Sequence, residues 1–216
     1  MGTDDRHKIA KAQRKRTIKK TKSISKKVLI ACEDTKSSRF YFTRMIKDYG
    51  LRGQVVFAKH IGTNPMKVLE AIKIHLLKDS NFDEKWIVID KDSYSKSEFN
   101  GTIASAKALD INVAYSNESY ELWILLHFKD QKAYINRLQL NKELKDLVDY
   151  EKSNEFIYEI IKSKQNEAIK RSKNLIKFFI DINGSSNPFD DNPSNTIYQL
   201  VESLEKLKTT KPSKEH

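Results

Sequence analysis

Acidic side chains follow three of four short apolar runs in the sequence, and these residues are the best suited to chemistry. Glu33 follows the first run, Asp90 and Asp92 follow the third, and Glu121 comes shortly after the fourth. If the runs are parallel strands of one sheet, these acids converge on one edge. Convergent carboxylates stay ionised most readily around a hard cation, Mg²⁺ or Mn²⁺, which in turn supports phosphodiester cleavage. The pattern therefore indicates a hard-cation site at this edge.

The same residue types also have structural interpretations. An Asp after a strand often caps a turn or a helix, and the chain has 29 acids, so some will end strands by chance. Lone His127, beside Trp123 and Phe128, is interpreted first as a hydrogen-bonded core histidine, with a ligand role left open. Cys32 ends an apolar run, which favours packing over a nucleophilic role.

Strand and helix patterns alternate in the first two thirds of the chain. Four short apolar runs predict strands over residues 28–32, 54–58, 85–89 and 111–115. Each is followed by an amphipathic pattern that predicts a helix, over residues 37–48, 64–77, 97–109 and 120–128. Such alternation is typical of an α/β fold in which helices flank a central, mostly parallel, four-stranded sheet.

The remainder, residues 129–208, is predicted to be mainly helical. A helical spacing of apolar residues runs from about 154 to 182, with a polar gap near residues 163–167, and a last helix is expected over about 194–207. No linker separates this part from the sheet, and about 80 residues would make a small domain. We therefore expect residues 27–208 to form one domain.

The net charge of +11 is concentrated at the N-terminus. Residues 1–27 contain eleven Lys or Arg against two Asp, a net +9, whereas the other 189 residues carry only +2. Residues 1–26 are accordingly predicted to be a disordered basic arm, and residues 209–216 a disordered tail. The arm is either a salt-sensitive tether for a phosphate backbone or a solubilising extension, and both interpretations stay open.

Several protein classes are disfavoured by composition. The single cysteine excludes an internal disulfide framework and a multi-cysteine zinc site. No apolar stretch approaches the roughly 18 residues of a membrane span, so a cytoplasmic protein without membrane contact is expected. The sequence lacks a glycine-rich phosphate loop, which makes an intrinsic ATPase or a nicotinamide enzyme improbable.

A longer set of residues carries a resemblance to a known family. The matching segments lie in this order along the chain: Val28 to Glu33, Tyr41-Phe42, Gly62 and Pro65, Asp83 to Asp92, Ser116-Asn117, Glu121 to Phe128, Tyr150-x-Lys152, Asn192 to Thr196, Tyr198 and Leu200. The block Ser-Asn-x-x-x-Glu-Leu-Trp-x-Leu-Leu-His-Phe is the specific part. This order resembles the RloB-like family over most of residues 26–207.

The resemblance implies a Toprim/Rossmann-like domain in which Glu33, Asp90 and Asp92 take the places of the metal-binding carboxylates. It makes Glu121 and His127 candidates for the active edge and Lys152 a candidate for phosphate contact. It also implies association with abortive-infection and restriction loci, with an AAA-type ATPase encoded alongside. The family tends to show Glu-Gly and then Thr-Glu after the first strand, whereas this chain has Glu33-Asp34 and Ser37-Ser38. The departures at Asp34 and Ser38 remove one candidate ligand or capping group.

Two functions are therefore expected in competition. The first is a Mg²⁺- or Mn²⁺-dependent endonuclease of anti-phage defence, with catalytic residues Glu33, Asp90, Asp92, Glu121, His127 and Lys152. The alternative is a catalytically degenerate subunit that binds nucleic acid or senses a phage component for its ATPase partner. A strand-passing or primase activity is disfavoured, because the chain has neither a zinc-binding nor a tyrosine-nucleophile module. The sequence leaves open whether the substrate is DNA or RNA, what triggers the activity, and whether the protein is a homo-oligomer.

Overall fold

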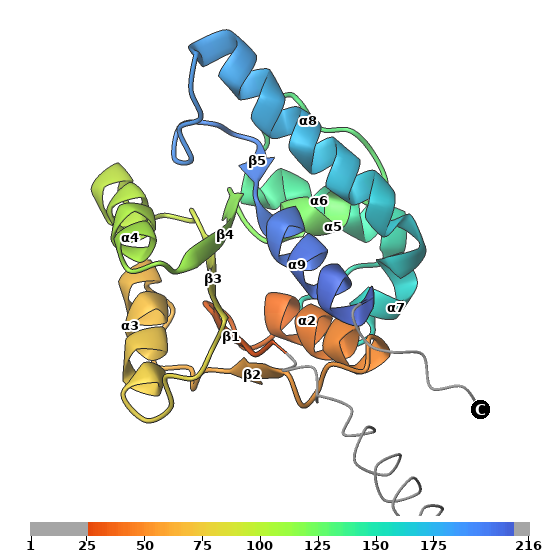
Figure 1. Ribbon diagram of the computed structural model, residues 1–216. Helices are drawn as coiled ribbons and strands as arrows, with labels where there is room; N and C mark the ends of the chain where they lie inside the picture. The colour runs from red at the N-terminus through yellow and green to blue at the C-terminus, as the bar shows by residue number, and fades with distance from the viewer. Residues whose placement is uncertain (1–25, 210–216) are drawn as a thin grey trace, which may run out of the picture.

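The computed structural model describes residues 26–209. The predicted arm over residues 1–26 and the predicted tail over residues 209–216 lie outside this range, apart from Lys26 and Thr209. Within the described range, the chain folds around one mixed sheet with helices on both faces (Figure 1). The predicted α/β fold class is confirmed.

The central sheet has five strands in the order β2-β1-β3-β4-β5. The first four strands lie where the apolar runs predicted them and pair in parallel: β1 (Val28–Cys32), β2 (Val55–Phe57), β3 (Glu84–Asp90) and β4 (Asn112–Asn117). The prediction of four strands is one short, because β5 (Ser194–Asn195) pairs antiparallel with β4. A two-residue polar strand has no apolar alternation, so its sequence resembles the start of the helix expected there.

Helices cover the two faces of the sheet separately. α2 (Ser37–Asp48) lies on one face, and α3 (Pro65–Leu76) and α4 (Lys96–Ala108) lie on the other (Figure 1). The alternation of β1 side chains explains the division, because Val28 and Ile30 join the core on the α2 side and Leu29 joins the core on the α3 side. The sheet is thus buried on both faces, as its continuous apolar runs require.

Local caps fix where two of these helices begin. The Asn64 side chain accepts a hydrogen bond from the Met66 backbone N–H, with Pro65 at the first helical position of α3. α4 begins with a capping box between Ser95 and Glu98. Both helices therefore start shortly after the loops that leave the carboxyl edge of the sheet.

The C-terminal part is helical, as predicted, but its helices are shorter and more numerous. They are α6 (Arg137–Val148), α7 (Ile157–Ile161), the 3₁₀ turn η1 (Lys162–Lys164), α8 (Gln165–Asn183) and α9 (Ile197–Thr209). The helix predicted over residues 120–128 is the shorter α5 (Glu121–Leu125). The helical spacing predicted over about 154–182 divides into α7 and α8, and the 3₁₀ turn η1 lies between them where the predicted polar gap begins. α6 was not anticipated individually, and its Asn136-x-x-Gln139 capping box is the signal that could have found it.

The C-terminal helices extend the core on the α2 side of the sheet. Trp123, Leu200 and Leu204 are fully buried there together with Tyr41 and Phe42. This packing makes the sheet and the C-terminal helices one unit within residues 26–209. Among these residues, no helix is long and apolar enough to cross a membrane.

Candidate active site at the carboxyl edge of the sheet

The first two predicted site residues, Glu33 and Asp90, are in direct contact. β1 and β3 are neighbours and pair in parallel, so their carboxyl ends lie side by side. The Glu33 backbone N–H donates to the Val88 carbonyl at 2.9 Å, which continues the sheet register by one residue. The Asp90 backbone N–H in turn donates to Glu33 Oε2 at 2.7 Å. The Glu33 carboxyl group is thereby fixed across the end of β3.

Glu121 approaches this pair from the first turn of α5. Its side chain is only 1% exposed. The Tyr150 hydroxyl donates to Glu121 Oε1 at 3.2 Å, and the ammonium group of Lys152 lies 3.4 Å from the same oxygen. Glu121 Oε2 is buried and has no hydrogen-bond partner among the described residues. A buried carboxylate oxygen without a partner is costly, and it is a position that a cation or a bound water would satisfy.

Burial and mutual repulsion raise the pKa values of the two strand-end carboxyl groups. Burial is the main cause of a Glu33 pKa of about 8; the Asp90 N–H opposes it, and Asp92 and Asp34 add to it. For Asp90 the pKa is raised well above its ordinary value, first by burial and then by the charges of Glu33 and Glu121. Without a cation, this site therefore holds protons that an exposed carboxyl pair would lose.

Asp92 lies at the same edge but already has a counter-ion. Its Oδ1 is 2.8 Å from a guanidinium nitrogen of Arg137, the first residue of α6. Burial lowers the pKa of Arg137, but its hydrogen bond to Asp92 and the charges of Asp92, Asp90 and Glu121 outweigh this and leave the pKa raised. Arg137 is thus a cation directed at the whole acidic cluster.

The loop after β4 holds Arg137 in this position. Glu118 Oε2 accepts a hydrogen bond from the Arg137 backbone N–H at 2.7 Å, at the start of α6. The Glu118 carbonyl accepts from the Asp92 backbone N–H at 3.0 Å, so one residue ties both partners of the ion pair. Lys91 lies 3.8 Å from the Glu118 carboxylate and balances its charge.

The remaining two predicted residues differ in their surroundings. Lys152 reaches the edge and is half-exposed while it pairs with buried Glu121. His127 is 1% exposed, and its Nδ1 lies 2.8 Å from the Trp123 carbonyl. Its ring packs edge-on against Trp123, and burial lowers its pKa to about 4. These contacts match the core interpretation of His127, which is neutral at physiological pH, and no contact with the acidic cluster is recorded within residues 26–209.

The two departures from the family pattern contact each other. The Ser38 hydroxyl donates to Asp34 Oδ1 at 2.7 Å, and Ser38 is buried in the first turn of α2. This bond spans the turn from β1 into α2, which otherwise lacks a side-chain cap on its preceding residue, Lys36. The Ser38 position therefore fixes the loop that follows Glu33.

Most polar side chains at this edge are oxygen donors, but within the described part of the chain they do not form a preorganised metal-binding site. Among residues 26–209, no group of three or more His, Cys, Asp or Glu side chains is arranged to hold a metal ion. Cys32 is buried next to Glu33, and burial raises the pKa of its thiol to about 12, so it is a packing residue rather than a thiolate. The chemistry available here comes from Glu33, Asp90, Asp92 and Glu121 together with the cations Arg137 and Lys152.

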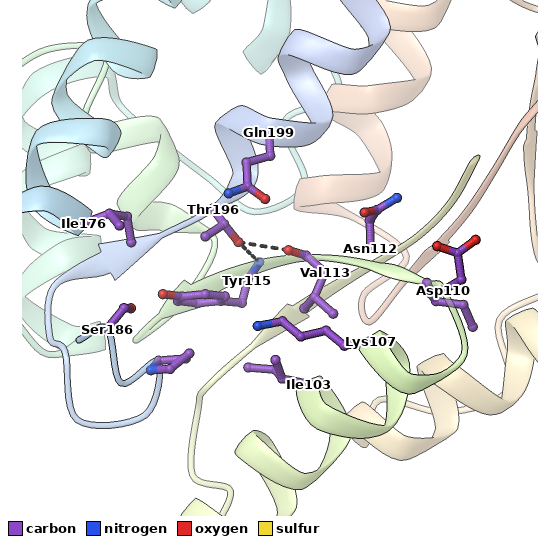
Figure 2. Close-up of a pocket in the computed structure, with 12 residues that line it drawn as sticks. Ile103, Lys107, Asp110, Asn112, Val113, Tyr115, Ile176, Ser186, Thr196 and Gln199 are labelled. Atoms are coloured by element: carbon purple, nitrogen blue, oxygen red, sulfur yellow. Dashed lines mark hydrogen bonds between the residues drawn. The ribbon is translucent and has the colours of Figure 1, made fainter. Parts of the chain in front are cut away.

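A separate cavity of about 390 Å³ lies between α4, β4 and the segment that leads into α9 (Figure 2). Thr196, which directly follows β5, is hydrogen-bonded to β4 beside this cavity. Its hydroxyl accepts from the Tyr115 backbone N–H and donates to the Val113 carbonyl, each at 3.0 Å. Lys107 extends into this region from α4. None of the acidic residues of the edge lines this cavity, so it is distinct from the candidate active site.

Comparison with known proteins supports the sequence resemblance. The model of the RloB family, described as RloB-like protein, matches residues 28–204. The chain belongs to the RloB-like family. The matched range contains all six predicted site residues of this family member as well as Arg137. Neither the search of curated proteins nor the search of solved structures gave a match.

Sequence reasoning missed Arg137. Its position at the start of a helix was detectable from the Asn136-x-x-Gln139 capping box, but nothing in the sequence joins that helix to the carboxyl edge. The connection arises only in the folded chain, where Glu118 binds the first backbone N–H of α6 and so places Arg137 beside Asp92. In this RloB-like chain, the acidic edge and its counter-ions thus come from five separate stretches of sequence.

Proposed function

We propose that this protein is a metal-dependent nuclease that hydrolyses phosphodiester bonds of DNA or RNA. The observation that carries the proposal is the contact between the partly buried Glu33 and Asp90, with buried Glu121 nearby, at the carboxyl edge of a parallel sheet. Raised carboxyl pKa values in such a location are typical of functional sites. A purely structural cluster would be expected to neutralise its acids with partners in every direction.

The donor chemistry suits Mg²⁺ or Mn²⁺. Both ions prefer oxygen ligands, and Glu121 Oε2 is a buried oxygen without a partner. Glu33, Asp90 and Asp92 would hold the ion, with Glu121 completing the set. To bind the ion, the Asp92 carboxylate would have to break its ion pair with Arg137. When bound, the ion would supply a polarised water and charge stabilisation at a phosphoryl oxygen.

The cations at the edge have a complementary role. Lys152 is half-exposed and its ammonium lies against Glu121, so it can turn to a phosphate oxygen of the substrate without leaving the edge. Arg137 fixes the orientation of Asp92 and lowers the net negative charge that an approaching phosphate meets. His127, with its low pKa and its bond to the Trp123 carbonyl, supports the position of α5 rather than carrying charge.

The biological setting is proposed from the family resemblance. We propose a cytoplasmic role in prokaryotic anti-phage defence, in concert with an AAA-type ATPase encoded alongside. The resemblance of the Ser116 to Phe128 block supports this setting.

One observation favours the second candidate, a catalytically degenerate binding or sensor subunit. The Arg137 guanidinium forms an ion pair with Asp92. In a site that no longer binds metal, this arginine would permanently replace the metal ion as the counter-ion. Titration calorimetry with Mn²⁺ separates the two functions, because a degenerate site takes up no metal near neutral pH.

The test of the nuclease is a cleavage screen with Mg²⁺ and Mn²⁺ on single-stranded DNA, double-stranded DNA and total tRNA. Asp90→Asn should abolish cleavage, since it removes a proposed metal-binding carboxylate at the centre of the cluster, and should leave folding and nucleic-acid binding intact. Asp146→Asn, an exposed carboxylate on α6, is the matched control. Cleavage that survives both Asp90→Asn and Glu33→Gln would refute the assignment.

A further inference from the structure

Arg39, on the first turns of α2, has the features of an anion receptor. The central carbon of its guanidinium lies over the Phe57 ring, 3.6 Å from the ring centroid. The side chain is half-buried, and burial lowers the pKa of Arg39. Among residues 26–209, its five N–H donors have no hydrogen bond to a side chain or carbonyl, and it has no ion pair with a carboxylate. An arginine that is held over a ring, is partly desolvated and has no hydrogen-bond or ion-pair partner is well suited to bind an anionic ligand.

Arg39 lies between two hollows in the surface. The first, of about 450 Å³, is also lined by Asp34, Phe57, Lys59 and His60. It adjoins the acidic edge, because His60 Nε2 lies 3.0 Å from the carbonyl oxygen of Glu33 and because Cys32 and Asp34 line it. One end of this hollow therefore opens beside the candidate active site.

The second hollow, of about 340 Å³, continues from Arg39 along the outside of α2. It is lined by Thr43, Arg44, Lys47 and Arg52. Arg39, Thr43 and Lys47 are spaced by four residues, so they form one stripe about 12 Å long on the helix surface. The two hollows together are called the basic groove below.

Charge separates the basic groove from the acidic edge that it adjoins. Five lysine or arginine side chains line the groove, against the carboxylates of Asp34 and Glu155. Glu155 is 3.5 Å from Arg44, whereas no ion pair is recorded for Lys47, Arg52 or Lys59 within the described part of the chain. The residues outside the first 27 carry a net charge of only +2, so this local excess is not a property of the whole surface.

Two of these cations lie over aromatic rings. Besides the Phe57 and Arg39 pair, the Arg44 guanidinium lies 4.5 Å from the ring centroid of Phe156, which is 57% exposed. Phe57 is partly buried beneath Arg39, so the accessible ring is that of Phe156. Proteins hold single-stranded nucleic acid by such means, since cations follow the backbone while an accessible ring or guanidinium plane stacks on a base. A duplex presents its phosphates but not its base faces, so it would use only half of these groups.

We infer that the basic groove binds single-stranded nucleic acid and leads its backbone past Arg39 to the acidic edge. That the bound strand is led to the acidic edge for cleavage rests on the proposed nuclease function. Binding of the strand in the groove does not depend on cleavage. Arg39 contacts the phosphate nearest the edge, and Lys47 and Arg52 contact phosphates farther along the strand. The feature that decides the assignment is the unpartnered guanidinium between two hollows that carry the same charge.

Binding of a fluorescein-labelled single-stranded oligonucleotide, followed by anisotropy in EDTA with the full chain, tests this. Arg39→Gln should weaken binding about tenfold, the loss expected for one charged hydrogen-bonding partner. The slope of log K against log salt concentration should fall in magnitude by about 0.7 for Arg39→Gln and by about 1.4 for Lys47→Gln/Arg52→Gln. The double variant changes exposed residues only, so it tests the groove even if Arg39→Gln is unstable.

Lys177→Gln is the matched control, because Lys177 is an exposed lysine in the second half of α8 and lines neither hollow of the basic groove. It should change neither the affinity nor the slope by a comparable amount. Arg39→Gln and the double variant both binding like the wild type would overturn the inference. So would a duplex of the same sequence that binds as tightly and loses as much affinity in both variants.

The outcomes also separate this inference from the proposed function. Cleavage that depends on Asp90, in a protein whose binding is unchanged by Arg39→Gln and by the double variant, would refute the groove and leave the nuclease standing. Binding that depends on Arg39, in a protein that cleaves no substrate with either metal, would establish the groove and refute the nuclease.

Discussion

Replacing Glu33 with Gln should stabilise the metal-free protein, and more strongly as the pH rises. The structure gives the reason: Glu33 is partly buried, and desolvation raises its pKa from 4.5 to about 8. In the unfolded chain the group ionises freely near pH 4.5, whereas the folded chain keeps its proton up to about pH 8. The folded state therefore binds more protons in this interval, and the free energy of unfolding falls as the pH rises through it.

The magnitude follows from the same numbers. A change in pKa from 4.5 to about 8 corresponds to about 5 kcal/mol at 1.36 kcal/mol for each factor of ten. We expect roughly half of this, about 2–3 kcal/mol, because the ionised side chain can turn toward water and because neighbouring Asp90 adjusts its own protonation. The Asp90 backbone N–H, which donates to Glu33 Oε2 at 2.7 Å, finds an amide oxygen in the variant, so no hydrogen bond is lost.

Urea unfolding in EDTA, followed by the fluorescence of the buried Trp86 and Trp123, measures the effect. The free energy of unfolding should be similar for the wild type and Glu33→Gln at about pH 4, and the variant should gain about 2–3 kcal/mol by about pH 8.5. Asp146→Asn, which removes an exposed carboxylate of α6, should show no such pH-dependent gain. A Glu33→Gln effect that is constant from about pH 4 to 8.5 would refute the reasoning from burial and repulsion.

Two further predictions concern the core and the charge of the chain. Trp123→Ala should lower the free energy of unfolding by about 3–5 kcal/mol, because the Trp123 side chain is fully buried and packs on His127 at 4.8 Å between ring centroids; a loss below about 1 kcal/mol in urea unfolding would contradict this. Deleting residues 1–25 should weaken binding to an oligonucleotide and flatten its salt dependence, because that segment contains nine of the forty lysines and arginines. An unchanged salt slope in the truncated protein would show that the segment is not a tether.

The sheet and the acidic pair were predictable because both depend on local sequence. A continuous apolar run that ends in an acid predicts a buried strand with a carboxylate at its carboxyl end, and parallel pairing then brings Glu33 and Asp90 together. β5 was not predictable, because Ser194 and Asn195 form a strand only through pairing with Asn117 and Ser116. Their sequence has no pattern that differs from the start of a helix.

The counter-ions could not be predicted for a related reason. Arg137 and Lys152 belong to a helical region whose periodicity says which face is apolar but not which strand end it reaches. The link depends on single contacts, such as that between Glu118 and the first backbone N–H of α6. Arg39 was visible only as a polar residue of a helix, since its importance comes from the Phe57 ring beneath it. Long-range side-chain pairs of this kind are set by the complete fold.

The net charge of +11 conceals two opposite surfaces beside each other. Acids gather where β1, β3 and α5 meet, and their raised pKa values show that the fold tolerates them at a cost. Cations gather along α2 and the end of β2, next to those acids. A polyanion is attracted to the second surface and repelled by the first unless a cation or protons neutralise it. In the proposed nuclease, the approach of a phosphate backbone would therefore depend on the charge state of Glu33 and Asp90, which a protein that only bound nucleic acid would not need.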